Sequence, residues 1–179
     1  MHTKRNTALI VYESMFGATR RIAEAIAEGL STSADCTVVE VGHAPSVIGH
    51  DVDLLVIGAP THVFGLSTPQ TRRDAETVGK VISRELGVRE WLAGLIVLTP
   101  MTRAAAFDTR VKQRWVPGSA AHRIEHAAKR KGLTPGAEPM SFRVEGKTGP
   151  LLAGELDRAR EWGEMLGLEL TSAAAGRTL

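Results

Sequence analysis

A short segment between an apolar run and a helix-like pattern has the residue types needed to bind an anion. Ser14 and Thr19 carry hydroxyl groups, and Gly17 lets the backbone approach a ligand closely. The helix predicted from Thr19 begins with amides that lack an intrahelical acceptor, and its dipole adds about half a positive charge there. Residues 14–19, the first loop, are therefore expected to hold a phosphate; the alternative is an ordinary turn with a threonine cap.

Two more segments with polar residues follow apolar runs. The second loop, residues 60–65, follows the run at 53–58 and includes Thr61 and His62. The third, residues 99–110, follows the run at 94–99 and includes Arg103. If the runs are parallel strands, their carboxyl ends share one sheet edge, and ligands bind at that edge. We therefore expect the three loops to converge there.

The apolar runs alternate with helical patterns along the chain. Buried strands are predicted at residues 8–12, 37–41, 53–58, 94–99 and 140–144. Helices are predicted from Thr19, from the Ser67-Thr68-Pro69 start, over 119–131 and over 153–168. This alternation favours right-handed βαβ units and an α/β fold with helices on both faces of a parallel sheet. Residues 1–171 are expected to form one domain, followed by a frayed tail at 172–179.

Composition narrows the class of protein. The chain has 179 residues, 22 Lys and Arg against 20 Asp and Glu, and one cysteine, Cys36. A net charge of +2 does not favour nucleic-acid binding, and one cysteine excludes an internal disulfide. No apolar run approaches the roughly 20 residues of a membrane span, and the first residues lack a secretory pattern. These features predict a soluble, cytoplasmic protein.

The first two loops resemble those of the flavodoxin family. Its phosphate loop reads Ser/Thr-x-Thr-Gly-x-Thr; Ser14, Gly17 and Thr19 match three of its four defined positions. Phe16 replaces the middle hydroxyl residue, and His62 stands where many flavodoxins have a tryptophan. The third loop lacks the glycine and tyrosine common in the family, although residues 107–110 resemble a segment of one divergent branch of flavodoxin-domain proteins.

The resemblance implies a doubly wound, five-stranded parallel sheet of order 2-1-3-4-5 in a three-layer α/β/α fold, with FMN as cofactor. The first loop would wrap the FMN phosphate, the second would border the flavin ring, and Thr99 and Pro100 would contact the flavin edge. It implies no catalytic side chain and no metal. The cofactor-binding residues expected on this basis are Ser14, Met15, Phe16, Gly17, Ala18, Thr19, Pro60, Thr61, His62, Val63, Phe64, Gly65, Thr99 and Pro100.

Two functions remain open at this point. The first is an FMN-binding protein in electron transfer, either a carrier or an FMN-dependent oxidoreductase linked to NAD(P)H or a quinone. Its partner would be a redox protein or a small-molecule electron donor or acceptor. The second is a flavodoxin-fold module that has lost FMN and acts in protein interaction or regulation. One missing hydroxyl and one or two missing rings total about 2–4 kcal/mol, which weakens FMN binding without abolishing it.

One motif suggests zinc but is better explained by helix amphipathicity. His122, Glu125 and His126 match His-x-x-Glu-His, a zinc motif of one metallopeptidase class. Ala121 and Ile124 supply the apolar face of this predicted helix, which leaves the motif on the solvated side. No third ligand follows at helical spacing, so no metal site is expected.

Overall fold

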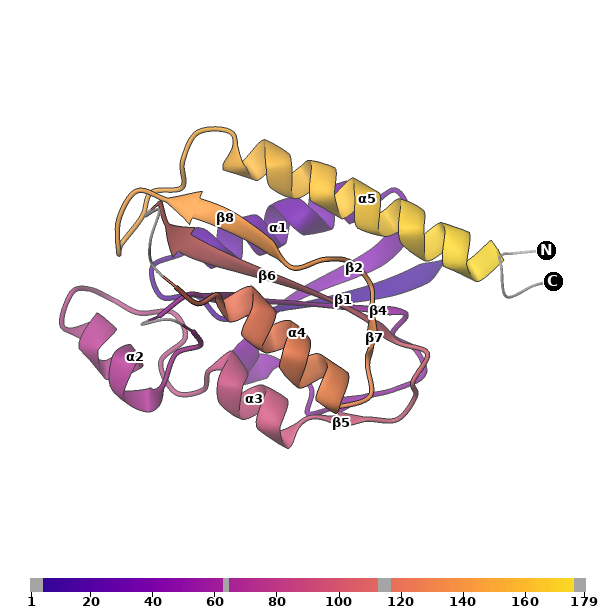
Figure 1. The fold of residues 1–179 in the computed structure, drawn as a ribbon, viewed down its shortest axis with the longest axis horizontal. Coiled ribbons are helices and arrows are strands. Elements are labelled where there is room, and N and C mark those ends of the chain that lie inside the picture. The colour runs from indigo at the N-terminus through magenta and orange to yellow at the C-terminus, as the bar shows by residue number, and fades with distance from the viewer. Residues whose placement is uncertain (1–4, 63–64, 113–116, 176–179) are drawn as a thin grey trace.

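A parallel sheet lies at the centre of the molecule, with helices on both faces (Figure 1). The computed structural model describes residues 5–62, 65–112 and 117–175. The strand order is β2-β1-β4-β6-β7, and β8 also pairs with β6. Since β7 and β8 occupy the same side of β6, this is the predicted 2-1-3-4-5 order, which is confirmed. The strands are β1 (Asn6–Tyr12), β2 (Ala34–Glu40), β4 (Leu54–Pro60), β6 (Arg103–Val111), β7 (Thr134–Pro135) and β8 (Met140–Val144).

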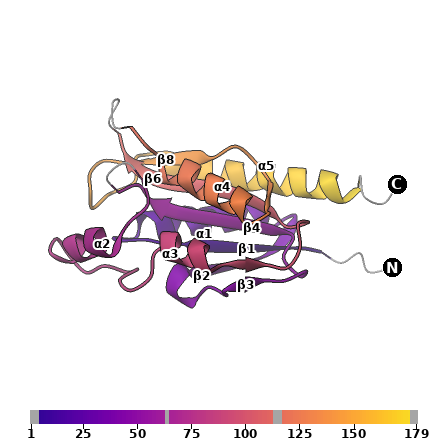
Figure 2. The ribbon, with the colours of Figure 1, turned by 60° about the horizontal axis from the view of Figure 1, so that its bottom comes forward.

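The helices form the two outer layers. Figures 1 and 2 show α1 and α5 on one face of the sheet, α3 and α4 on the other, and α2 beyond the carboxyl ends of the strands. Two Gly residues let α1 and α5 approach closely, because a Cβ on Gly29 or Gly163 would overlap the backbone of the other helix. The helices are α1 (Ala18–Leu30), α2 (Pro69–Glu76), α3 (Val88–Gly94), α4 (Ala120–Arg130) and α5 (Glu155–Ala175).

Each face of the sheet has its own apolar core. Beneath α1 and α5, the rings of Phe107, Phe142 and Trp162 pack edge to face with centroids 6.1–6.3 Å apart. Beneath α3 and α4, Leu55 and Ile57 of β4 pack with smaller residues of α4. Because side chains alternate along a strand, β6 directs Phe107 to one core and its neighbours to the other.

The fourth strand is not where the sequence pattern placed it. The apolar run at 94–99 contains only β5 (Ile96–Val97), which pairs with β3 (Val47–Ile48) in a separate two-stranded sheet. The fourth strand of the main sheet is β6, so most of the predicted third loop is strand. The error has a physical cause: three alanines and the polar residues after Phe107 give β6 little apolar contrast, although Ala104 to Thr109 are buried.

This correction removes two residues from the expected site. Thr99 and Pro100 precede β6, at the amino edge of the sheet, where Arg103 N–H donates to the Asp53 carbonyl. The first loop follows β1 at the carboxyl edge, so Thr99 and Pro100 lie at the opposite edge of the sheet from it and do not converge with the first loop as expected. The C-terminal boundary also shifts, because α5 continues to Ala175 and residues 172–175 are helical rather than frayed. Residues 176–179 lie outside the described part.

Gly58 is required by the packing of β4 against β6. A Cβ at this position would overlap the buried ring of Phe107, which lies opposite it in the sheet. We expect Gly58→Ala to lower the free energy of unfolding by about 1–3 kcal/mol, the usual range for overpacking a core. Gly94→Ala is the matched control, because no atom lies within 4 Å of its added methyl. Equal urea midpoints for the two variants would contradict this role for Gly58.

Candidate functional site

A cavity of about 330 Å³ lies at the carboxyl ends of β1, β4 and β6. Eight of the expected cofactor residues line it, from Ser14 to Thr19 without Gly17, and from Pro60 to His62. Val63 and Phe64 lie outside the described residues. The remaining walls come from α2, the ends of β6 and β8, and the turn after β8: Thr71, Asp74, Ala75, Val78, Thr109, Arg110, Val111, Val144, Gly146, Lys147, Thr148 and Gly149.

The first loop is folded by its own serine. Ser14 is fully buried, and its Oγ accepts hydrogen bonds from the amides of Gly17, at 3.1 Å, and Arg20, at 3.4 Å. Gly17 adopts a φ of 100°, a left-handed conformation that favours glycine. The helix then begins at Ala18, so the first amides of α1 have no intrahelical acceptor beside the cavity. These amides and the helix dipole can hold an anion.

A strap from residues 82–83 fixes the first loop from behind. Ile82 N–H donates to the Met15 carbonyl at 3.0 Å, and Ser83 N–H donates to the Ser14 carbonyl at 2.9 Å. In return, Ser14 N–H donates to Ser83 Oγ at 3.0 Å, and that hydroxyl donates to Glu40 Oε1 at 2.5 Å. The Ser14 peptide group is therefore held from both sides, which limits movement of the loop.

The second loop is held by a buried carboxylate of β6. Asp108 is fully buried, and its Oδ2 accepts from Thr61 Oγ1 at 3.0 Å and from Ser119 Oγ at 2.6 Å. The same oxygen accepts from Ala121 N–H at 3.1 Å, near the start of α4. Thr61 Oγ1 in turn accepts from Ala120 N–H at 3.0 Å. Asp108 thus joins the second loop to the N-terminus of α4, where a negative charge is favourable.

His62 lines the cavity on a backbone fixed by two short hydrogen bonds. Its N–H donates to the Gly65 carbonyl at 2.7 Å, and Gly65 N–H donates to the His62 carbonyl at 2.6 Å. Burial lowers the pKa of the His62 imidazole, and the positive charge of Arg72 lowers it further. The imidazole is therefore mainly neutral at pH 7.

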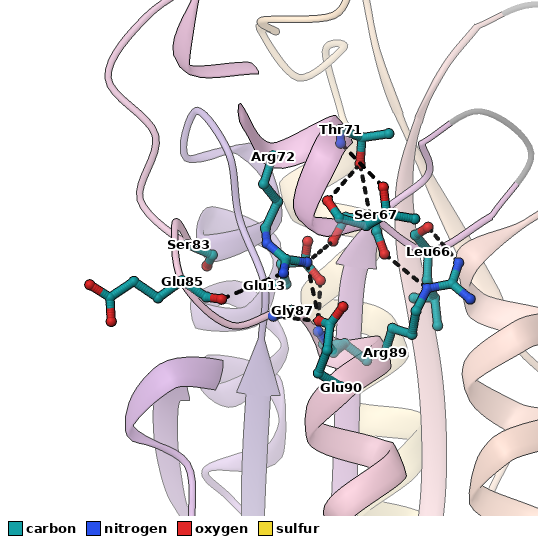
Figure 3. Close-up of polar contacts among 12 residues, drawn as sticks. Glu13, Leu66, Ser67, Thr71, Arg72, Ser83, Glu85, Gly87, Arg89 and Glu90 are labelled. Atoms are coloured by element: carbon teal, nitrogen blue, oxygen red, sulfur yellow. Dashed lines mark hydrogen bonds and ion pairs between the residues drawn. The ribbon is translucent and has the colours of Figure 1, made fainter. Parts of the chain in front are cut away.

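Arg72 belongs to a buried polar cluster behind the cavity wall (Figure 3). Its guanidinium is 2% exposed and donates to Ser67 Oγ at 2.8 Å, to Glu90 Oε2 at 3.2 Å and to the Glu85 carbonyl at 3.5 Å. These contacts connect the start of α2 to the segment that leads into α3. They fix the wall of the cavity that carries Thr71, Asp74, Ala75 and Val78.

Glu13 lies in the same cluster, next to the first loop in sequence. Its Oε2 accepts from Val88 N–H at 2.8 Å, while Oε1 has no partner among the described residues. Burial raises the pKa of this carboxyl, and hydrogen bonds from Ser67 and Val88 and the charge of Arg72 oppose the rise. Glu13 is therefore held in an environment that disfavours its charged form.

Three charged cavity residues were not predicted as site residues. Asp74 comes from α2, Arg110 from the end of β6 and Lys147 from the turn after β8. A signal for Arg110 and Lys147 was present, because each lies near the carboxyl end of a strand in a parallel sheet. Arg110 lay within the expected third loop, at residues 99–110, but only Thr99 and Pro100 of that loop were expected to bind the cofactor. Lys147 was missed because the turn after the fifth predicted strand had not been considered.

Because the strap depends on the Ser83 hydroxyl, removing this one group should destabilise the protein. Ser83→Ala leaves the buried Ser14 amide without its acceptor and removes one hydrogen bond to Glu40. We expect the free energy of unfolding to fall by about 1–3 kcal/mol, measured by urea denaturation. Ser46→Ala, at an exposed serine, is the control. If both variants unfold at the same urea concentration, the strap does not stabilise the first loop.

The raised pKa of Glu13 predicts a specific pH dependence of the free energy of unfolding. A carboxyl whose folded pKa is raised contributes stability below its unfolded pKa and loses it as pH rises through the folded pKa. Relative to Glu13→Gln, the wild type should therefore be most stable below about pH 4 and lose stability above it, by at most about 1.4 kcal/mol per pH unit. Glu138→Gln, at an exposed position, should show no such trend. A pH-independent difference between wild type and Glu13→Gln would exclude this behaviour.

No described helix has the length and apolar character needed to cross a membrane. The described part of the chain also contains no group of three or more His, Cys, Asp or Glu that could hold a metal ion. Within α4, Glu125 of the His-x-x-Glu-His motif forms an ion pair with Lys129 at 2.7 Å.

Comparison with known proteins agrees with this geometry. Residues 9–76, which contain the first two loops, match the flavodoxin domain family model. No curated protein matches the chain significantly. Among solved structures, an archaeal flavodoxin is 18% identical with a TM-score of 0.63, covering 92% of this chain and 99% of its own.

Two bacterial structures are similar over a comparable length. Oxidised flavodoxin 1 from Bacillus cereus is 16% identical with a TM-score of 0.64, covering 93% of this chain and 98% of its own. A WrbA-like flavodoxin from Agrobacterium tumefaciens is 17% identical with a TM-score of 0.55, over 93% and 98%. At these identities the likeness concerns the fold. Residues 9–76 thus match the flavodoxin domain family, and the described residues have the flavodoxin fold.

Proposed function

We propose that this protein binds FMN in the cavity at the carboxyl edge of the sheet and serves in electron transfer. The observation that carries the proposal is the cavity itself, which brings the first loop, the N-terminus of α1 and the second loop around one space. Its volume of about 330 Å³ falls within the roughly 300–1,000 Å³ of small-molecule sites.

The residues around the cavity fit the two ends of FMN. The amides at the start of α1 suit a phosphate, which binds well at a helix N-terminus. Met15, Phe16, Ala75 and Val78 give an apolar lining that suits a flat aromatic ring. Bound FMN would supply the electron chemistry, while the protein sets its orientation and electrostatic environment.

In this proposal the backbone holds the phosphate more than the hydroxyls do. Ser14 Oγ already accepts two amide hydrogen bonds within the loop. Thr19 Oγ1 lies 2.8 Å from Thr109 Oγ1, within one shared hydrogen bond. In the first turn of α1 the Arg20 amide donates to Ser14 Oγ, which leaves the amides of Ala18 and Thr19 for the phosphate, since neither has an intrahelical acceptor. Pro60, Thr61 and His62 would border the ring, and Val63, Phe64 and Gly65 remain part of the proposed second loop.

A second candidate function is a flavodoxin-fold module without FMN, active in protein interaction or regulation. The observation that favours it is the internal pairing of the first-loop hydroxyls, together with Phe16 in place of a hydroxyl residue. Such a loop is stable without a ligand. Flavin titration of the purified protein separates the two candidates.

A test for catalytic turnover distinguishes an electron carrier from an FMN-dependent enzyme. A net charge of +2 gives little long-range attraction for a strongly basic redox partner. With FMN-loaded protein, NAD(P)H oxidation in the presence of a quinone would favour an FMN-dependent oxidoreductase. FMN reduction without turnover would favour a carrier that meets a redox protein.

The phosphate loop predicts a gain of affinity from one substitution. Phe16→Thr introduces the hydroxyl that the family pattern has at this position, whereas Phe16→Val has nearly the same shape without it. One added neutral hydrogen bond of about 0.5–1.5 kcal/mol should make Phe16→Thr bind FMN roughly 2- to 12-fold more tightly than Phe16→Val. The measurement is an absorption titration near 450 nm, the region where flavins are expected to absorb.

Riboflavin is the control ligand for the phosphate contact, since it has the same ring as FMN but no phosphate. It should bind more weakly than FMN and should not distinguish the two Phe16 variants. An absence of spectral change at high micromolar FMN in the wild type would reject the flavin site and support the interaction module. Equal affinities of the two variants for FMN would reject the assigned orientation of its phosphate.

A further inference from the structure

The structure holds His62 beside the cavity on a rigid support. Its backbone pairs with Gly65, and the neighbouring Thr61 is tied to the buried Asp108. The imidazole lines the same space as the start of α1, Ala75 of α2 and Val78, which follows α2. His62 is therefore a titratable group with a fixed backbone, placed where a bound ligand would meet it.

The buried cation of Arg72 acts on His62 and is held in place by its own hydrogen bonds. Arg72 makes its hydrogen bonds to Ser67, Glu90 and the Glu85 carbonyl, all within the cluster drawn in Figure 3. Glu90 offsets part of its charge, yet the remaining field still acts on His62. Because Arg72 is anchored in this way, its effect on the imidazole does not require a flexible side chain to approach.

The other charges around the cavity come from three elements. Asp74 lies on α2, Arg110 at the end of β6 and Lys147 on the turn after β8, while residues 14–19 contain no ionisable side chain. Glu13 lies behind the first loop in the buried cluster, where its charged form is disfavoured. Of these charged groups, Arg72 is the one that lowers the His62 pKa, and together with burial it favours a neutral imidazole while no anion is bound.

We propose that His62 takes up a proton from solvent when negative charge enters this cavity. The inference rests on the proposed function, because reduction of FMN is the event that would bring the charge. Bound FMN would take two electrons from a reductant and one proton on reduction, and its ring would then carry one added negative charge. His62 would bind a second proton from solvent and neutralise that charge. On reoxidation both electrons would pass to an acceptor and both protons would return to solvent.

The uptake follows from the same fields that keep the imidazole neutral. Burial and the charge of Arg72 oppose a positive charge on His62 until an anion lies beside it. An adjacent negative charge reverses the balance, since opposite charges within about 4–6 Å shift a pKa by roughly 1–3 units. Proton uptake by His62 therefore requires an anion that forms or binds next to the second loop.

The test is a histidine-resolved NMR titration of the full chain with oxidised FMN and with FMN reduced by dithionite. The His62 pKa should lie about one unit or more higher in the reduced complex. His50, exposed and outside the cavity lining, is the internal control and should titrate alike in both states. An unchanged His62 pKa in a complex that binds FMN would overturn the proposal while leaving FMN binding intact.

A second measurement uses the variant His62→Gln, which retains a polar side chain but cannot take up the proton. For a two-electron couple, each proton taken up contributes about 30 mV per pH unit to the midpoint potential. At pH values between the His62 pKa of the oxidised complex and that of the reduced complex, the midpoint potential should change with pH more steeply in the wild type than in His62→Gln. The difference in slope should be about 30 mV per pH unit. Equal slopes would overturn the proposal.

Failure of FMN binding gives a different result from failure of proton uptake. If the wild-type protein does not change the absorption spectrum of FMN, the proposed function fails. Sulfate then serves as the probe of negative charge in the cavity. A rise of the His62 pKa with sulfate would support proton uptake without flavin. A constant pKa with sulfate would overturn both proposals.

Discussion

The buried carboxylate of Asp108 is the interaction on which the carboxyl edge of the sheet depends. One oxygen atom accepts hydrogen bonds from the second loop, from the cap of α4 and from the backbone of α4. A buried charge is costly unless it is hydrogen-bonded, so these donors must be present together. Their joint requirement fixes where β4 ends, how the second loop turns and where α4 begins.

The first loop depends on a different set of buried groups. Ser14 folds the loop through its hydroxyl, the strap holds its peptide group, and Glu13 and Arg72 lie in the cluster behind it. Buried charged groups of this kind add little net stability, since desolvation offsets their attraction. What they contribute here is position: the α2 wall and the first loop face the same cavity.

The two loops consequently meet the cavity with different chemistry. The first presents backbone amides and a helix dipole, which act on charge and do not titrate. The second presents His62, whose charge depends on what lies beside it. A site with a fixed positive end and a titratable side is suited to a ligand that has a permanently anionic group at one end and gains negative charge at the other. FMN meets both conditions, and this agreement links the proposed cofactor to the proposed role of His62.

The alternation of apolar runs and amphipathic patterns was sufficient for the α/β class and for most elements. Helices beginning near Thr19 and Ser119 and the strands containing residues 8–12 and 140–144 were predicted close to their observed bounds. The first two loops were also identified, because hydroxyl and glycine residues at a strand-to-helix junction have few other local explanations. The strand order came from the family resemblance, and the structure confirms it.

Local pattern did not identify the fourth strand, because two candidate strands lie close together between residues 94 and 111. The more apolar one, at Ile96, pairs only with β3, whereas Ala104 to Thr109 enter the main sheet. Small side chains suit that position because Phe107 and the helices fill the space around them, which is a property of packing. The positions of Asp108, Arg72 and Lys147 around the cavity likewise depend on tertiary packing and not on local sequence pattern. The sequence by itself determined the fold class and the two loops that line the cavity, since these follow from short-range patterns along the chain. Only the tertiary structure decided the fourth strand and the charged surroundings of the cavity, because both depend on contacts between distant segments.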